Sequence, residues 1–315
     1  MKKITFTLVI LVTSLACAAE AQALPFRTFV SIAGDDANDC TLKTPCRTFV
    51  GAVPKTEAGG EITAVDSGTY FGVVTINKAL TIQAAPGVYA LLAAVATPAS
   101  PVTVSAGAGD VVVLRNLYVS QMPVKKGKVP TKGIELKSAG ALHVESSIVT
   151  GVPNAGLFGV GACDSAKLCT PLLIKDSVFR ENGAGMNIGS VTASIDHCRI
   201  ERNGTGVLIQ PQSRVTMRGS VVAGNSMVGL DAQEFESITN VENCVVTNNG
   251  TGIRAAVVSA GGREFGHTIF YLSATMITGN QTGLAANGGE VVSFTNNRLA
   301  NNTLDGSFTS TITQQ

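Results

Sequence analysis

The feature that most constrains this sequence is a set of residue columns recurring about every 21 to 24 residues through its second half. Segments 174–188, 195–209, 217–231 and 241–255 can be aligned with one another, and each begins with an aliphatic residue or methionine. The alignment contains an asparagine column, made of Asn182, Asn203, Asn225, Asn249, Asn280 and Asn302. It also contains a glycine column, made of Gly185, Gly206, Gly229, Gly252, Gly283 and Gly306. We infer a tandem structural repeat, because this many matching lines do not arise by chance.

A repeat this short cannot bury its apolar face alone, so successive coils are expected to stack around one continuous core. One interior column should consist of Val144, Ile174, Ile195, Met217, Val241, Leu272 and Phe294. A second should consist of Val149, Phe179, Ile200, Val222, Val246, Ile277 and Leu299. The asparagines are expected to hydrogen-bond from coil to coil, and the glycines to supply a positive φ at the bend. No helical periodicity competes with this pattern.

Other repeat and sheet architectures fit less well. The Leu-x-x-Leu-x-Leu frame of a leucine-rich repeat is missing, and an antiparallel sandwich would not keep columns aligned over so many units. Less regular coils extend upstream through 62–65, 73–82 and 111–119. The stretches 122–132, 152–171 and 256–267 break the period and are expected to be loops. Insertions in solenoids usually gather on one face, often the binding face.

The N-terminus has the pattern of an export signal. Lys2 and Lys3 precede an apolar run over 4–16, and Ala21-Gln22-Ala23 has the small-x-small pattern of a signal peptidase site. We expect residues 1–23 to be removed by cleavage after Ala23, and the product to be secreted or periplasmic. A lipoprotein anchored through Cys17 is the alternative, but Ser14 stands where a lipobox has an aliphatic residue.

Composition narrows the function classes. The net charge is +1, and charged residues make up 14% of the sequence, which gives no electrostatic case for nucleic acid as a partner. The mature chain contains no second apolar run long enough for a transmembrane segment. No cofactor is indicated.

The cysteines fall into two groups. Cys40 and Cys46, and likewise Cys163 and Cys169, lie close together in turn-rich segments, which in an exported protein predicts two local disulfides. A metal site would need ligand spacing that neither pair has. Cys198 and Cys244 belong instead to a column of small residues with one coil between them. They are therefore too far apart to bond, and we predict free, buried thiols acting as small apolar fillers.

The residue columns resemble those of the pectin lyase-like superfamily, over roughly residues 62–308. The segments 30–40 and 45–49 resemble the N-terminal module of secreted bacterial proteins with this fold. The resemblance implies an all-β protein, a right-handed single-stranded parallel β-helix (solenoid) with an N-terminal cap. It also implies that the cysteine pair of the cap forms a disulfide. The expected organisation is a signal peptide over 1–23, the cap over 24–60, the β-helix over 61–308 and a polar tail over 309–315.

The catalytic motifs of this superfamily are absent. Gly266-His267-Thr268 and Arg199-Ile200-Glu201 are the nearest approaches to the Gly-His-Gly and Arg-x-Lys motifs of the polygalacturonate hydrolases, and both fail at the last residue. No aspartate pair suits general acid and base roles. No acidic cluster on neighbouring coils suits the Ca²⁺ of a pectate lyase, so no metal site is predicted.

One outward charged column remains as a candidate site: Glu145, Lys175, Asp196, Arg218 and Glu242, with alternating sign. In the catalytic interpretation, Asp176 and His197 exchange protons while Arg218 or Lys175 neutralises a substrate carboxylate, with Arg199 further round the coil. In the structural interpretation, the column is a ladder of surface ion pairs, each worth under about 1 kcal/mol. The structural interpretation is preferred.

Two functions are therefore compared. The first is an exported, non-catalytic β-helix that serves as a surface or extracellular scaffold, adhesin or glycan-binding module. The alternative is a polysaccharide lyase or epimerase acting on uronate-containing polymers. The missing motifs favour the first. In both, the expected partner is a polysaccharide or cell-surface glycan, although few aromatic side chains are available to stack on sugars: there are 4 tyrosines and no tryptophan.

Overall fold

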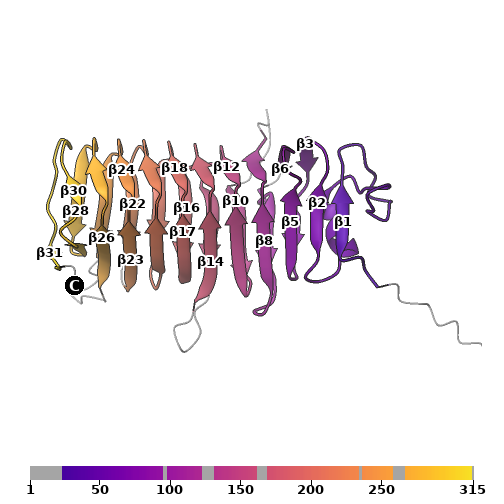
Figure 1. Ribbon diagram of the computed structural model, residues 1–315, viewed down its shortest axis with the longest axis horizontal. Coiled ribbons are helices and arrows are strands. Elements are labelled where there is room, and N and C mark those ends of the chain that lie inside the picture. Colours follow the sequence, from indigo (N-terminus) through magenta and orange to yellow (C-terminus); the bar gives the residue numbers. More distant parts are fainter. Residues whose placement is uncertain are drawn as a thin grey trace, which may run out of the picture.

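The computed structural model of the protein describes residues 23–94, 98–122, 131–161, 169–233, 236–257 and 267–313. Residues 1–22 of the predicted signal peptide lie outside these residues. Cys163 also lies outside them, and so does the predicted disulfide between Cys163 and Cys169. The chain winds into a rod of stacked coils (Figure 1), and each coil contributes one strand to each of up to three sheets. Every strand pairing between coils is parallel, so the predicted parallel β-helix is confirmed. No helix in the described part of the chain is long and apolar enough to cross a membrane.

The three sheets are named A, B and C in the order in which a coil enters them. Sheet A consists of β1 (Arg27–Val30), β2 (Glu61–Ala64), β5 (Leu80–Ala84), β8 (Val111–Arg115), β11 (Ala141–Glu145), β14 (Thr170–Lys175), β17 (Val191–Asp196), β20 (Arg214–Arg218), β23 (Ser237–Glu242), β26 (Thr268–Ser273), β29 (Glu290–Ser293) and β31 (Ser310–Thr311). Sheet B consists of β3 (Gly68–Phe71), β6 (Ala90–Ala94), β9 (Tyr118–Gln121), β12 (Ile148–Thr150), β15 (Val178–Arg180), β18 (Arg199–Glu201), β21 (Val221–Ala223), β24 (Val245–Thr247), β27 (Met276–Thr278) and β30 (Arg298–Leu299). Sheet C consists of β4 (Val74–Ile76), β7 (Val102–Ser105), β10 (Lys132–Ser138), β13 (Ala155–Val160), β16 (Ala184–Gly189), β19 (Thr205–Ile209), β22 (Val228–Gln233), β25 (Thr251–Ala256) and β28 (Thr282–Asn287).

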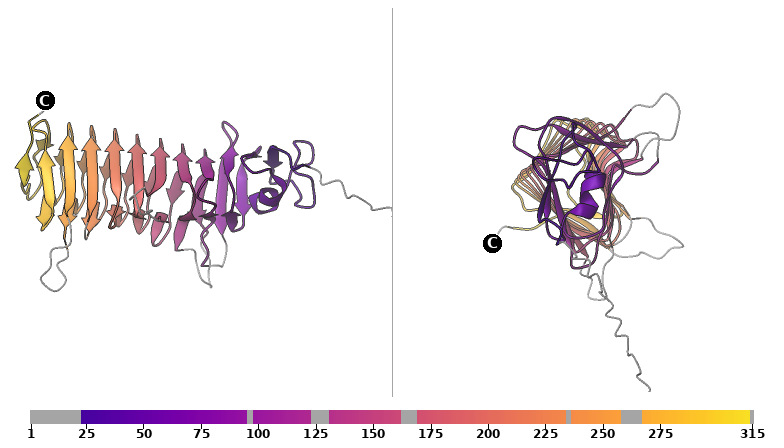
Figure 2. Two further views of the ribbon diagram at one scale, coloured as in Figure 1. Left: turned by 90° about the horizontal axis from the view of Figure 1, so that it is seen from below. Right: turned by 90° about the vertical axis from the view of Figure 1, so that its right-hand side faces the viewer.

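The N-terminal end of the rod contains the short helix α1 (Phe49–Ala52) and the 3-10 turn η1 (Val53–Lys55). The right-hand view of Figure 2 looks onto this end of the rod. Phe49 packs against Tyr70 with 5.1 Å between ring centroids. The disulfide between Cys40 and Cys46 closes a loop in the same region.

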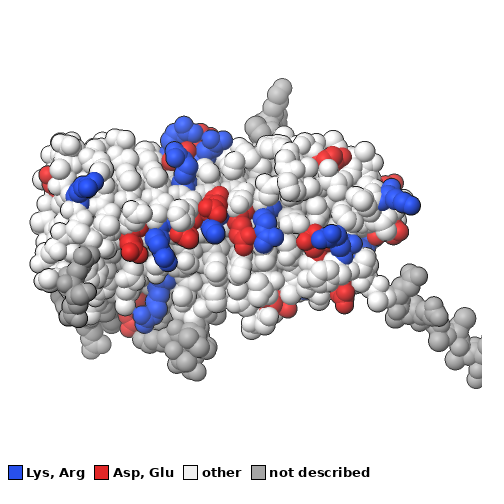
Figure 3. All heavy atoms as spheres, in the orientation of Figure 1, with Lys and Arg blue, Asp and Glu red and all other residues white. Residues whose placement is uncertain are grey.

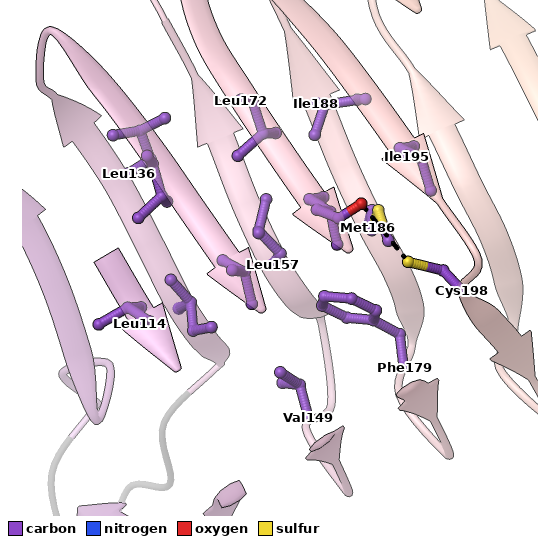
Figure 4. Packing of buried hydrophobic residues seen from close by; sticks show 14 of the residues in the cluster. Leu114, Leu136, Val149, Leu157, Leu172, Phe179, Met186, Ile188, Ile195 and Cys198 are labelled. Atoms are coloured by element: carbon purple, nitrogen blue, oxygen red, sulfur yellow. Dashed lines mark hydrogen bonds between the residues drawn. The ribbon is translucent and has the colours of Figure 1, made fainter. Parts of the chain in front are cut away.

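The core is a continuous apolar column inside the three sheets, and Figure 4 shows its side chains pointing into the shared interior. The second predicted interior column is in register throughout, because Val149 pairs with Phe179, and the pairing continues coil by coil to Leu299. The first is in register from Val144 to Leu272.

One member of the first column was predicted wrongly. Ser293, not Phe294, pairs with Leu272, because Val291 opposite Phe270 fixes the alternation of β29. Phe294 is therefore displaced from the core and lies half-buried on the outside.

The stretch 152–171 is also not a loop throughout. It contains β13, and β14 begins within it. The pattern was missed because this coil has no asparagine in the ladder column, although Gly156 occupies the position of the glycine column.

Each asparagine of the column hydrogen-bonds to the next coil in the same way. The Oδ1 of Asn225 accepts from the backbone N and the Nδ2 of Asn203, at 3.0 Å in both cases. The Nδ2 of Asn225 donates to the carbonyl of Ile200 at 3.1 Å and to Oδ1 of Asn249 at 2.9 Å. This pattern repeats from Asn182 to Asn302, and it satisfies backbone groups that the turn between sheets B and C would otherwise leave buried and unpaired.

The glycines serve a different purpose from the one predicted. Only Gly306 of the six has a positive φ, whereas the residues that precede the ladder asparagines do, among them Glu181, Arg202 and Gly224. A Cβ on Gly229 would lie 2.6 Å from the carbonyl oxygen of Gly252 and 3.0 Å from the Nδ2 of Asn249. The glycine column is therefore required because it lets the asparagine ladder and the neighbouring backbone approach closely.

Cys198 and Cys244 are buried and unpaired, as predicted. They do more than fill space, because their thiols lie in a second ladder that serine and threonine hydroxyls otherwise form. The backbone N of Ser220 donates to the Sγ of Cys244 at 3.4 Å, and the hydroxyl of Ser220 accepts from the backbone N of Cys198 at 3.0 Å.

Burial raises the pKa of both thiols to about 11, from an ordinary value of 9.0. The folded state keeps the thiols protonated, so their contribution to stability is complete below pH 9 and is lost as the pH rises towards 11. We expect the unfolding free energy to fall by about 2 kcal/mol per thiol over this interval. The double variant Cys198→Ser, Cys244→Ser should lose this component of the alkaline decline, because serine occupies the equivalent position in other coils. Urea unfolding of both proteins at several pH values measures this difference. An equal fall of the unfolding free energy between pH 9 and pH 11 in the two proteins would contradict the prediction.

Candidate functional site

The predicted charged column lies on the outer face of sheet A. In the strand register, each residue of the column lies opposite the next one, in the order Glu145, Lys175, Asp196, Arg218 and Glu242. Figure 3 shows the resulting band, in which blue and red alternate along the rod. Two contacts lie in and beside this band. Arg115 Nε lies 2.8 Å from Glu145 Oε2 on the neighbouring strand, and His197 Nδ1 lies 3.1 Å from Oδ1 of the preceding residue, Asp196.

Asp176 and His197 occupy successive copies of the turn between sheets A and B, each with a φ of 51°. The carboxylate near His197 is that of Asp196, and Asp176 Oδ2 lies 3.9 Å from the Nζ of Lys175. The side chain of His197 is 62% exposed and that of Asp176 is 52% exposed, so the environment of both is largely water. The structure therefore pairs His197 with Asp196, whereas the catalytic interpretation paired it with Asp176.

Arg199 lies on the outer face of sheet B and pairs with Glu201 at 2.8 Å. Lys175 and Arg218 stay on sheet A, one on each side of Asp196. The five candidate residues therefore spread over an exposed corner of the rod and do not converge on an enclosed site.

A hollow of 630 Å³ lies on the same face of sheet A, nearer the C-terminal end. Its lining consists of Asn240, Val241, Glu242, Tyr271, Ser273, Phe294, Ile312 and Thr313. Tyr271 is one of the 4 tyrosines that could stack on sugars, but the sequence did not predict the hollow.

Alternation along the strands places the polar side chains of this hollow. Asn240 and Glu242 flank the buried Val241 on β23, and Tyr271 and Ser273 flank a buried leucine on β26, so all four side chains point outward. The one-residue displacement at the end of β29 adds Phe294, whose ring centroid lies 6.3 Å from that of Tyr271. The hollow thus combines two aromatic rings with a carboxylate, an amide and a hydroxyl.

The neighbouring strand β20 carries two guanidinium groups, and one of them lies opposite a residue that lines the hollow. Arg218 pairs with Glu242 in register, and Arg214 pairs with Ile238, four residues earlier on β20. Both arginine side chains are exposed. Within the described ranges, neither has an acidic partner at salt-bridge distance.

The acidic and histidine side chains do not gather into a metal site. Across the residues that the structure describes, no group of three or more His, Cys, Asp or Glu side chains is placed to hold an ion.

Comparison with known proteins shows the family to which the chain belongs. Residues 132–299 match the family model described as the right handed beta helix region. The match spans 168 of 315 residues, and the chain therefore belongs to this family. The right-handed parallel β-helix predicted from the sequence is thereby confirmed. No curated protein matches the chain.

Solved structures of similar fold include three that are described as carbohydrate-active enzymes. An alginate lyase from Paenibacillus sp. str. FPU-7 is 14% identical, with a TM-score of 0.62 over 88% of this chain and 97% of that one. The pectate lyase Pel9A is 16% identical, with a TM-score of 0.48 over 85% and 67%. The A-module of the Azotobacter vinelandii mannuronan C-5 epimerase AlgE6 is 14% identical, with a TM-score of 0.42 over 86% and 88%. At this identity, the likeness to the alginate lyase establishes the fold alone.

Proposed function

We propose that this protein is exported and binds an acidic polysaccharide in the hollow on the outer face of sheet A. The observation that supports this most strongly is the composition of the hollow, where the Tyr271 and Phe294 rings lie beside the polar groups of Asn240, Glu242 and Ser273. Aromatic faces pack against the apolar faces of sugar rings, while amides, carboxylates and hydroxyls exchange hydrogen bonds with sugar hydroxyls.

The bordering arginines support an acidic ligand. A guanidinium matches a carboxylate in a bidentate geometry, and Arg214 and Arg218 are exposed on the strand adjoining the hollow. A uronate chain lying across β20, β23 and β26 would meet guanidinium groups first and aromatic rings next. Export is supported by the predicted signal peptide and by the disulfide between Cys40 and Cys46.

A lyase or epimerase acting on the same polymer is the second candidate, and one observation favours it. The phenol of Tyr271 and the carboxylate of Glu242 lie on adjacent strands of the hollow, with Arg218 opposite Glu242 on the far side. In β-elimination, a base removes the C5 proton of the uronate while a guanidinium neutralises its carboxylate. The C4–O bond then breaks, and its oxygen takes up a proton. In epimerisation, the C5 proton is instead returned from the opposite face.

Replacing both rings should remove the proposed binding. In Tyr271→Ala, Phe294→Ala the affinity for oligogalacturonate or oligomannuronate should fall at least tenfold, because each ring loses its stacking surface. Calorimetric titration at fixed salt measures this. The matched control is Tyr89→Ala, which removes an exposed tyrosine far from the hollow and should leave the affinity unchanged.

A neutral oligosaccharide that binds as tightly as the acidic ones, or a double variant that binds normally, would overturn the proposal. The same polymers test the second candidate through the absorbance of unsaturated uronates and through exchange of the C5 proton with deuterated solvent. A product that appears with the wild-type chain and is lost in Tyr271→Phe would establish catalysis in the hollow.

A further inference from the structure

A charged pair lies on the outer face of sheet C, away from the hollow. The Nε of Arg254 lies 2.7 Å from Oδ1 of Asp231, and its Nη2 lies 2.6 Å from Oδ2, so the two groups form a bidentate pair. Gln233 adds a third donor to the carboxylate, at 2.7 Å from Oδ2. The side chain of Asp231 is 2% exposed and that of Arg254 is 32% exposed.

The fold itself does not call for this pair. Asp231 and Arg254 occupy one outward column of sheet C, and in the adjoining coils the same column is filled by Leu208 and Ala285. Burying a carboxylate has a large desolvation cost, and a buried ion pair is often no better for stability than apolar residues of similar size. The pair therefore indicates a role other than holding the coils together.

The pair fixes the orientation of the guanidinium. Its Nε and Nη2 are held by Asp231, which leaves Nη1 to meet a ligand. Within the described ranges, no protein partner of Nη1 is found. Because Asp231 accepts three hydrogen bonds and is nearly inaccessible, it acts on any ligand only through Arg254.

Amide side chains of Gln233 and of two preceding coils lie on the same face of the rod. Gln210, directly after β19, donates from Nε2 to Oδ1 of the buried Asn187 at 2.8 Å. Gln233 ends β22, the strand that pairs with β19. Further along the rod, the ring of Phe158 pairs in register with Asn187. The face thus presents amide groups and an oriented cation in one row, and the Nζ of Lys132 lies over the Phe158 ring at 3.7 Å from its centroid.

We propose that this row on sheet C is a second binding site for acidic glycans, in which Arg254 holds a carboxylate and the amides hold neighbouring hydroxyls. Asp231 is a positioning residue for Arg254. The proposal rests on the proposed function only for the class of ligand, since the two sites lie on different sheets and share no residue.

Calorimetric titration of the full chain with an acidic hexasaccharide, oligogalacturonate or oligomannuronate, tests the site. In the Tyr271→Ala, Phe294→Ala background, the remaining binding should weaken about tenfold or more in Arg254→Gln. Asp231→Asn should weaken it for acidic but not for neutral oligosaccharides, which a merely structural role would not predict. The matched control is Arg202→Gln, which removes an exposed arginine that is paired with Glu181 on a turn.

A measurement on the wild-type chain tests the same site without depending on the folding of a variant. The acidic hexasaccharide should protect Arg254 from phenylglyoxal, as followed by mass spectrometry of peptides, whereas a neutral hexasaccharide should not. Equal modification with and without the acidic ligand would overturn the proposal. Loss of binding only on changing the hollow would overturn this site and leave the proposed function intact; loss only on changing Arg254 would do the reverse.

Discussion

Asn225→Ala should lower the free energy of unfolding by about 3 to 4 kcal/mol, a large fraction of the stability of a typical domain. The side chain is fully buried in the middle of the ladder, and its Oδ1 accepts two hydrogen bonds from Asn203. Its Nδ2 donates to the carbonyl of Ile200. Alanine leaves these buried groups without their side-chain partner. Urea unfolding followed by circular dichroism measures the change.

The control for this variant is Asn287→Ala, at an exposed position on β28. It should change stability by no more than about 0.5 kcal/mol. A loss at Asn225 no greater than at Asn287 would show that the ladder is not a stabilising element.

Gly229→Ala should destabilise the fold by about 3 kcal/mol or more, or prevent accumulation of folded protein. The added methyl group would overlap the carbonyl of Gly252 and crowd the amide of Asn249 on the next coil. Neither can move away without breaking the ladder, because both belong to the packed turn. Yield of soluble protein and the unfolding midpoint are the observables.

Gly224→Ala separates this crowding from backbone strain. Gly224 has a φ of 64°, and the nearest atom to an added Cβ would be 3.7 Å away. The cost should be about 1 kcal/mol, that of a left-handed conformation for alanine. Arg202 and Asn248 adopt this conformation at the same turn in neighbouring coils, so Gly224→Asn should be nearly neutral. A larger loss at Gly224 than at Gly229 would reverse our explanation of the glycine column.

The fold could be predicted because each coil repeats the same buried apolar positions and the same hydrogen-bonded asparagine. The asparagine column and the second aliphatic column identified the stacking and its register without further information. Irregular coils were harder: β13 was missed where the ladder asparagine is absent, and Phe294 was placed in the core because a single slip of register reverses the face of a strand.

The site was less accessible to sequence reasoning. The charged column on sheet A was located correctly, yet alignment of columns could not show that the imidazole of His197 contacts the carboxylate of Asp196 and not that of Asp176. The hollow depends on the displaced Phe294 and on Ile312 near the C-terminus, which no repeat predicts. The pair Asp231 and Arg254 did leave a signal, since each stands two residues after a glycine of the column, in neighbouring coils.

A structure of the protein with a bound acidic hexasaccharide would test the central claim most directly. Our account predicts a sugar ring against Tyr271 and Phe294, with a uronate carboxylate directed towards Arg218 on the adjoining strand. A saturated complex in which the hollow on sheet A is empty, with the ligand elsewhere on the rod, would contradict it.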